Sequence, residues 1–236
     1  MKVSVVVTCF NLEDYLGEAI QSIQDQTHKV DEIILVHDGC DKPTAFNGVE
    51  TLFLPKNIGV ASARELGFRL TTGGYVLFMD ADDVLPDYFI EECCKVLDKG
   101  ADIAYPDTFS WSSWSHSLMD NAFFKSPKKI TLKDMVKFNR VLVTSLMKRE
   151  VYEKTGRFDK TLPIFEDYHF WMRALMKGFR FERAETYLKY RQRVKSRNHQ
   201  DDKIRKDTYN RIIQSVADEF CGGNLDKLLP GLKLHY

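Results

Sequence analysis

The first hundred residues of this chain alternate between short apolar runs rich in β-branched residues and segments whose apolar residues recur every three or four positions. The run Val3–Thr8 shows no regular polar alternation, which indicates a strand covered on both faces. Strands and helices that succeed one another at this pitch predict an α/β fold with a parallel sheet and helices on both faces. The expected strands are Val3–Thr8, Glu32–His37, Val49–Leu54, Tyr75–Met79 and Asp102–Tyr105, and the expected helices cover residues 12–26, 59–71 and 86–99.

The second half of the chain has weaker periodicity. Residues 106–127 hold Trp111 and Trp114 among Ser, Asp and Asn, and we expect a long loop there whose tryptophans offer a stacking surface to a ligand. Further along, the sequence predicts a Val141–Met147 strand between short helices at 131–139 and 149–155, and later helices at Glu166–Lys177 and 203–220.

Composition excludes several classes of protein. With 236 residues, 44% hydrophobic and 29% charged, the chain is neither disordered nor fibrous, and no apolar run approaches the roughly 20 residues of a membrane span. The first residues do not resemble a secretory signal. The five cysteines form no Cys-x-x-Cys and no Cys/His cluster with zinc-ligand spacing, so we expect reduced, buried thiols and a cytoplasmic protein.

The charge is balanced overall but unevenly distributed. The chain has 34 Lys and Arg against 34 Asp and Glu, yet residues 173–211 hold 13 basic and five acidic residues, a net charge of +8. A basic segment facing an acidic remainder suggests an anion near their junction.

Polar clusters follow the predicted strands, where open α/β sheets bind their ligands. The sharpest cluster is Asp80-Ala81-Asp82-Asp83, because neighbouring carboxylates repel one another unless a cation offsets them. Asp80 and Asp82 can share Mg²⁺ or Mn²⁺ with the oxygens of a diphosphate, whereas Asp83 is expected to cap the helix that begins near Pro86. The other clusters are Thr8–Asn11, His37–Asp41 and Phe165–Asp167.

Taken in order, these clusters resemble family 2 glycosyltransferases over residues 3–196. The resemblance implies a GT-A-type, mostly parallel nucleotide-sugar-binding sheet flanked by helices, with a helical C-terminal acceptor region. It divides the chain into a nucleotide-sugar-binding half (1–105), an acceptor-binding and catalytic-base half of the same domain (106–200) and a C-terminal helical extension (201–236). The matching motifs are Val5–Asn11, Glu32–Cys40, Asn57-x-Gly59 with Ala63-Arg64, Gly73–Tyr75, Asp80–Asp83, Gly156-x-Phe158-Asp159, Glu166-Asp167 with Trp171 and Arg173, and Tyr190-Arg191.

The resemblance also implies a role for individual positions. Asp38 matches the acid that binds the nucleotide base, and Thr8, Phe10 and Gly39 lie in the same two base-binding motifs. The remaining roles are a cation near the diphosphate (Arg64), a sugar or ribose contact (Asp80), the metal ligand (Asp82) and the general base (Asp167).

Two positions concern the metal. Arg193 stands where the family frequently supplies a histidine that completes the metal site, and arginine cannot bind a cation. Arg193 could instead hold the diphosphate in a bidentate contact, and His199 could supply the missing ligand. The implied cofactor is Mn²⁺ or Mg²⁺.

We therefore expect an enzyme that moves a sugar from a nucleotide-diphosphate donor, with a UDP-sugar favoured, to an acceptor hydroxyl, with inversion. The acceptor is open between a glycan or glycolipid, which would place the protein at a membrane surface, and a hydroxylated base in DNA. The alternative to an enzyme is a module that binds a nucleotide sugar without catalysing a reaction. His37 and Arg193 suggest it, because both depart from the family pattern.

Overall fold

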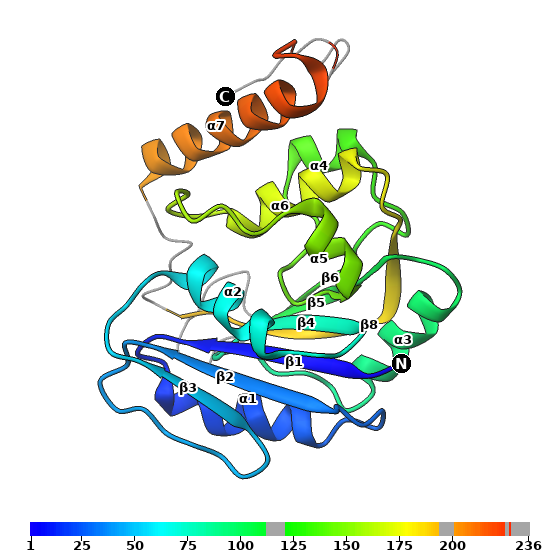
Figure 1. Cartoon of the computed structure of the whole chain (residues 1–236). Helices are drawn as coiled ribbons and strands as arrows, with labels where there is room; N and C mark the ends of the chain where they lie inside the picture. The colour runs from blue at the N-terminus through cyan, green and yellow to red at the C-terminus, as the bar shows by residue number, and fades with distance from the viewer. Residues whose placement is uncertain (112–120, 194–200, 225–226, 228–236) are drawn as a thin grey trace.

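The computed structural model describes residues 1–111, 121–193, 201–224 and 227. Helices and strands alternate through the first part of the chain and are mixed in the second (Figure 1). In chain order the elements are β1 (Val3–Cys9), α1 (Glu13–Gln24), β2 (Glu32–Asp38), β3 (Glu50–Leu54), α2 (Val60–Leu70), β4 (Tyr75–Asp80), α3 (Phe89–Asp98), β5 (Ile103–Trp111), β6 (Ala122–Phe124), α4 (Leu132–Lys137), β7 (Leu146–Lys148), α5 (Arg149–Thr155), α6 (Glu166–Met176), β8 (Phe181–Arg191) and α7 (Asp202–Cys221).

The described strands form one sheet in the order β3-β2-β1-β4-β7-β5-β6, and β8 pairs with β5. Strands β3, β2, β1 and β4 are parallel, β8 is parallel to β5, and the short strands β7 and β6 are antiparallel to their neighbours. The expected α/β fold with a mostly parallel sheet is confirmed. Strand β5 runs through residue 105, so the sheet is continuous between the first half of the chain and the second.

Both faces of the sheet are buried, as the apolar run of β1 predicted. Val3, Val5 and Val7 pack with α1 and α3 on one face. Val6 lies on the other face in a core that includes α2, α5 and α6 and extends to α7. Figure 1 shows α1 below the sheet, and α2, α4, α5, α6 and α7 above it.

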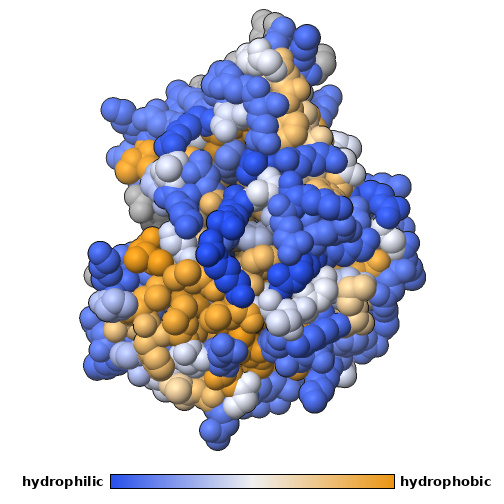
Figure 2. Space-filling view, viewed as in Figure 1, coloured by the Kyte–Doolittle hydropathy of each residue, from blue (hydrophilic) through white to orange (hydrophobic). Residues whose placement is uncertain are grey.

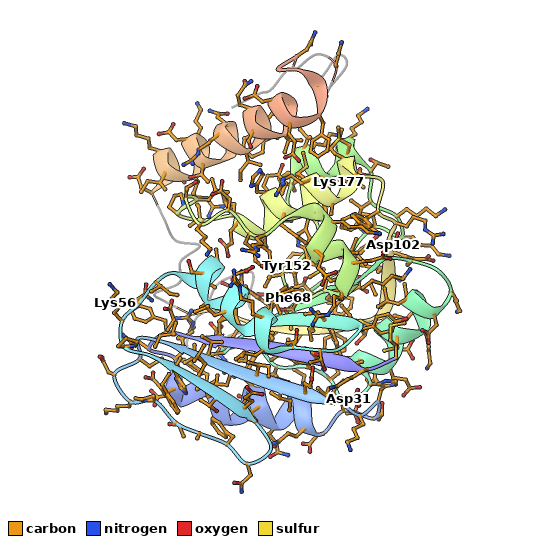
Figure 3. The ribbon with its side chains drawn as sticks, viewed as in Figure 1. Asp31, Lys56, Phe68, Asp102, Tyr152 and Lys177 are labelled. Atoms are coloured by element: carbon orange, nitrogen blue, oxygen red, sulfur yellow. The ribbon has the colours of Figure 1, made fainter. Side chains whose placement is uncertain are left out.

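Aromatic side chains join the first half of the chain to the second in the upper core. Phe68 of α2 and Tyr152 of α5 meet with ring centroids 4.3 Å apart, near the centre of the molecule (Figure 3). Phe170 and Trp171 of α6 are buried in the same core, so Trp171 of the family motif is a packing residue.

Several elements differ from the sequence expectation. Residues 106–127 are not a continuous loop, because β5 continues to Trp111 and β6 follows at residues 122–124, while Trp114 lies outside the described residues. The Val141–Met147 strand is reduced to β7, α3 begins at Phe89 rather than near Pro86, and β8 was not expected at all.

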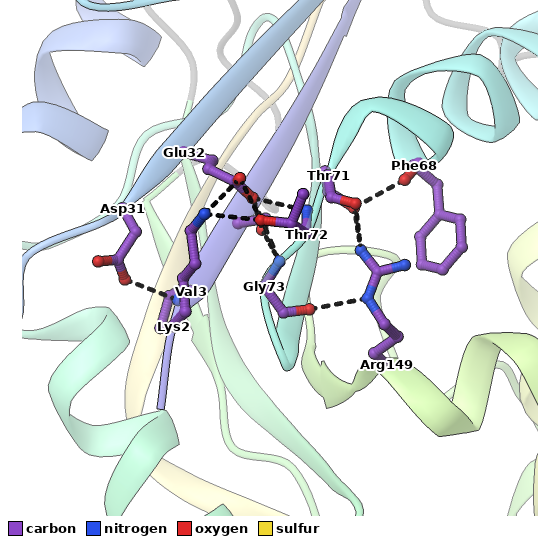
Figure 4. A network of polar contacts seen from close by, with 10 residues as sticks. Lys2, Val3, Asp31, Glu32, Phe68, Thr71, Thr72, Gly73 and Arg149 are labelled. Carbon is purple, nitrogen blue, oxygen red and sulfur yellow. Dashed lines mark hydrogen bonds and ion pairs between the residues drawn. The ribbon is translucent and has the colours of Figure 1, made fainter.

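A polar network fixes the amino ends of the strands, at the opposite edge of the sheet from the strand-end clusters (Figure 4). Glu32 accepts hydrogen bonds from Lys2 and from the amide and hydroxyl of Thr72. Although burial acts against it, these bonds and one from Ser4 lower the pKa of Glu32 to about 2. The network links β1, β2 and the α2–β4 turn, so it holds this end of the sheet rigid.

Basic residues of the 173–211 segment are paired within the protein. Arg173, Arg183 and Arg191 contact Glu219, Asp107 and Glu18 at 2.7, 2.8 and 2.5 Å, respectively. Much of the charge that suggested an external anion is therefore offset internally. In Figure 2 the upper, helical part of the molecule presents mostly hydrophilic groups, and apolar groups gather below, over part of the sheet. None of the helices in the described parts of the chain combines the length and apolarity needed to cross a membrane.

Candidate active site

A cavity of about 1150 Å³ opens at the carboxyl ends of β1, β2 and β4. It extends between α2 and the start of α6, so residues far apart in the sequence face one space. Gly39 is not among its lining residues, and His199 lies outside the described part of the chain. The predicted site residues that do line it are Thr8, Phe10, Asp38, Arg64, Asp80, Asp82, Asp167 and Arg193.

Asp38 organises the loop that follows β3. One carboxylate oxygen accepts the amide hydrogen of Ile58 at 2.7 Å, and the other accepts from the amide of Gly59 and the side chain of Asn57, both at 3.0 Å. A side chain at position 39 would collide with the backbone, because an added Cβ would lie 2.3 Å from the nitrogen of Asn57 and φ is +74°. Because Gly39 has no side chain, the loop after β2 can contact the loop after β3 at the cavity wall.

Thr8 and Phe10 follow from the end of β1. The Thr8 hydroxyl is buried and has no hydrogen-bond partner among the described residues, while Thr8 pairs in register with Asp80 of β4. Phe10 is 48% exposed and offers an aromatic face beside the cavity. An unpaired buried hydroxyl and an exposed ring suit a ligand that carries both polar and flat apolar groups.

Arg64 joins the two sides of the cavity. It projects from α2, is 2% exposed, and contacts Asp80 and Glu166 at 2.7 Å each. Burial favours the neutral form, but the two carboxylates outweigh it and raise the pKa of Arg64. Arg64 therefore stays charged, and its charge is already shared between two protein carboxylates.

Asp82 is paired with an arginine from the other half of the chain. Arg193 Nε lies 2.5 Å from Asp82 Oδ2. Burial and the nearby charge of Asp80 raise the pKa of Asp82, and Arg193 opposes that rise. Asp80 and Asp82 offer oxygen ligands of the kind a hard divalent cation prefers, and such a cation would relieve their mutual repulsion.

Asp83 does not cap a helix, contrary to the sequence expectation. The cap residue of α3 is Tyr88, without a side-chain cap bond, whereas Asp83 accepts a hydrogen bond from the backbone nitrogen of Arg191 at 3.2 Å. The Arg191 guanidinium lies 4.0 Å from the ring centroid of Trp111. Trp111 is thus part of the packing around β8 and does not lie in a loop.

Asp167 is the second residue of α6 and lines the same cavity as Asp82. Phe165, immediately before the helix, has a φ of 64°, a left-handed conformation that residues other than glycine rarely adopt. Burial and the adjacent charge of Glu166 raise the pKa of Asp167 to about 6, although Arg64 acts in the opposite direction. A carboxylate with such a pKa is suited to accept a proton near neutral pH.

Asn139 is a site residue that sequence reasoning missed. Its side-chain nitrogen donates to Asp167 Oδ2 at 3.2 Å, and it lies in the segment after α4. A lone asparagine outside any motif carries no sequence signal, so only the fold could have identified it. Glu18, which pairs with Arg191, was missed for the same reason.

Comparison with known proteins agrees with this geometry. The sequence profile described as glycosyl transferase family 2 matches residues 4–156, more than half of the chain. The chain belongs to this family. Proteins similar to it include an uncharacterized glycosyltransferase of Haemophilus influenzae, 28% identical over 80% of this chain, and one of Methanocaldococcus jannaschii, 27% identical over 86%. The chain spans 65% and 74% of the lengths of these two relatives.

Solved structures share the fold of this chain. S. aureus TarS 1-349, crystallised in complex with UDP-GlcNAc, superimposes with a TM-score of 0.76 at 19% identity. The match covers 97% of this chain and 70% of that one. The GT-A fold and the classification of this family 2 member as a glycosyltransferase are therefore confirmed.

Proposed function

We propose that this glycosyltransferase moves a sugar from a nucleotide-diphosphate donor, a UDP-sugar, to an acceptor hydroxyl with inversion at the anomeric carbon. One observation carries the proposal. Asp38, Asp82 and Asp167, each from a separate part of the chain, line a single cavity. A donor lying along the strand ends would place its nucleotide near Asp38 and its diphosphate near Asp82, with its sugar facing Asp167.

The donor is supported by the cavity and by a structural neighbour. At about 1150 Å³ the cavity is at the upper end of the range for small-molecule sites. The Thr8 hydroxyl and the Phe10 ring offer a polar and a stacking contact for a base. The TarS structure of the same fold holds UDP-GlcNAc, which favours uridine as the nucleoside.

The residues present fit a divalent cation. Asp80 and Asp82 would hold Mn²⁺ or Mg²⁺, which would neutralise the charge that develops on the departing diphosphate. Arg193 already neutralises Asp82, so it must shift to make room, and its guanidinium then becomes available to the diphosphate oxygens. Arg193 would then bind the diphosphate beside the metal ion and would not take the place of the metal.

Asp167 acts as the general base in this proposal. The acceptor oxygen forms a bond to the anomeric carbon while the bond from that carbon to the diphosphate oxygen breaks. Asp167 takes the proton of the acceptor hydroxyl, and the nucleoside diphosphate leaves with the electron pair. The base must lie on the side opposite the leaving group. Asp167 suits this role because α6 brings it to the cavity from a different segment than Asp82.

A saccharide acceptor, as a glycan or glycolipid, fits the relatives. A further relative is the putative teichuronic acid biosynthesis glycosyltransferase TuaG of Bacillus subtilis, 26% identical over 75% of this chain. We therefore favour a saccharide acceptor over a nucleic-acid base.

The test is a panel of UDP-, GDP-, dTDP- and CDP-sugars, assayed with and without Mn²⁺ for donor hydrolysis and for transfer to saccharide acceptors. We expect turnover with a UDP-sugar, and Asp167→Asn should lower the rate of transfer by roughly 10²–10⁴-fold. The matched control is Asp207→Asn, the same substitution at an exposed residue of α7 that does not line the cavity. This variant should keep full activity. Equal transfer by wild type and Asp167→Asn would refute the assignment of the base.

A further inference from the structure

Two cysteines and a histidine meet at the ends of β1 and β2, where the proposed reaction uses none of them. Cys9 and His37 are direct partners in the parallel register of these strands, and Cys40 follows two residues after β2. The Sγ atoms of Cys9 and Cys40 lie 3.7 Å apart. These sulfurs and a ring nitrogen of His37 all lie within 4.8 Å of one another.

The sulfur separation matches the edge of a tetrahedral zinc site. Two thiolates bound at about 2.3 Å and at tetrahedral angles lie about 3.8 Å apart. The cysteines are therefore placed for a shared ion without movement of the backbone.

His37 presents one ring nitrogen to this cluster. Its Nε2 lies 2.7 Å from the carbonyl oxygen of Thr44, a distance at which the nitrogen must donate its hydrogen, because two lone pairs would repel. The Thr44 amide nitrogen, at 3.2 Å from the same atom, is the longer contact. Nδ1 is then the unprotonated nitrogen, in the tautomer that metal-binding histidines adopt when a backbone carbonyl orients them.

The Nδ1 atom of His37 is buried and has no hydrogen-bond partner within the described part of the chain. The residue is 1% exposed, and its ring stacks on Phe53 at 5.3 Å with an interplanar angle of 4°. A buried acceptor without a donor costs free energy, and a cation bound to it would remove that cost.

Without an ion, both sulfurs are expected to be thiols. Burial raises the pKa of Cys9 and of Cys40, and the charge of Glu13 adds to the rise, although the backbone amides of Leu12, at Cys9, and Asn11, at Cys40, act in the opposite direction. Binding of zinc would therefore release a proton from each thiol. Two thiolates would also balance the charge of a divalent ion in this buried position.

We propose that Cys9, His37 and Cys40 bind a structural Zn²⁺ ion that ties the β1–α1 loop to the β2–β3 loop. Sulfur and imidazole ligands select zinc, whereas the oxygen ligands of Asp80 and Asp82 select magnesium or manganese, so the two sites are chemically distinct. The ion would hold in place the loops that carry Phe10 and Asp38. The expectation of no zinc-ligand cluster came from spacing along the chain, and the ligands come together only through strand pairing.

The experiment measures zinc by elemental analysis and by competition with a chromogenic chelator, on full-length protein kept reduced with a phosphine. We expect about one zinc ion per wild-type chain. Cys40→Ser should lower the affinity for zinc by more than roughly a hundredfold. Cys40 is the primary variant because it is only half-buried. Circular dichroism should show that Cys40→Ser folds as wild type does.

Two matched controls define the result. Cys221→Ser removes a half-buried thiol at the end of α7. Asp82→Asn removes a proposed ligand of Mn²⁺ or Mg²⁺. Both variants should bind zinc as wild type does. Cobalt added in place of zinc should give thiolate-to-cobalt charge-transfer absorption in wild type and Cys221→Ser, and it should not in Cys40→Ser.

Wild-type protein that binds no more zinc than Cys40→Ser would overturn the proposal. A second sample, purified without reductant, tests the alternative. The proposal is also overturned if this sample lacks zinc and two of its thiols become titratable only after reduction, because that result indicates a Cys9–Cys40 disulfide. These measurements need no sugar donor, so the zinc site and the proposed transfer reaction can fail independently.

Discussion

At the scale of single residues, Glu166 and Asp167 show how one segment provides two carboxylates with different tasks. Glu166 is paired with the buried cation of Arg64, whereas Asp167 receives a hydrogen bond from the amide of Asn139. Burial and the adjacent charge of Glu166 raise the pKa of Asp167 into the working range of a base. The family resemblance identified Asp167 in the sequence, but its burial is a property of the fold.

We predict a pH dependence from this residue. A general base works in its deprotonated form, so kcat/KM should fall as pH drops through about 6, the raised pKa of Asp167, and level off above it. The measurement is the pH–rate profile at saturating Mn²⁺, with Asp207→Asn as a variant that should give the same midpoint. A midpoint near pH 4, the ordinary range of an aspartate, would contradict the prediction.

Arg193 gives a second prediction, about the metal. Because Arg193 neutralises Asp82 at 2.5 Å, a cation must compete with it. Arg193→Ala should lower the Mn²⁺ concentration for half-maximal donor hydrolysis by roughly three- to tenfold, or about 1 kcal/mol, and should raise KM for the donor through the loss of a diphosphate contact.

Arg211→Ala is the control for this experiment, because Arg211 bonds to Thr161 and does not line the cavity. If Arg193→Ala instead needs more Mn²⁺ than wild type, then Arg193 does not compete with the cation.

At the scale of elements, the sequence predicted those whose apolar pattern is regular. Strands β1, β2, β3 and β4 and helices α1, α2 and α6 end within about three residues of their expected bounds. All of these except β3, which has no fully buried residue, bury one regular face or two. Strand β8 escaped prediction because its pattern includes charged residues at buried positions, Arg183 and Arg191. Their burial depends on Asp107 and Glu18, and a single segment cannot show such distant partners.

The Arg183–Asp107 pair supports a prediction about stability. Both side chains are under 10% exposed and lie 2.8 Å apart, joining β8 to β5. Arg183→Met should lower the free energy of unfolding by about 3–5 kcal/mol, because it leaves the carboxylate of Asp107 buried without its cation. Urea unfolding measures the loss, and adding Asp107→Asn to the variant should recover part of it.

Arg180→Met is the matched control, one residue before β8, because the Arg180 side chain is mostly exposed. It should change stability by at most about 0.5 kcal/mol. Equal losses in Arg180→Met and Arg183→Met would mean that burial of the pair is not the cause.

At the scale of the whole molecule, a few long-range polar contacts set the shape of the cavity. The sequence identified many of the polar residues that line it, because strand ends of a parallel sheet collect at one edge and the family motifs mark them. It could not show that Arg64 is committed to Asp80 and Glu166, 16 and 102 positions away. Arg64 is therefore a positioning residue that fixes the donor side of the cavity relative to the base.

This role leads to a prediction that combines stability with activity. Arg64→Met should destabilise the fold by about 3–5 kcal/mol, because Glu166 is buried and loses its cation. It should also move the midpoint of the pH–rate profile upward, because Arg64 is the charge that holds down the pKa of Asp167. Arg69→Met, on the same helix but more than half exposed, should leave that midpoint unchanged.

The double variant Arg64→Met/Glu166→Gln separates the effect on stability from the effect on the pH–rate profile. It removes the unpaired buried charge of Glu166, so it should be more stable than Arg64→Met. If the midpoint stays at the wild-type value in Arg64→Met, the guanidinium does not act on the base, and the coupling between the two halves of the site is mechanical only.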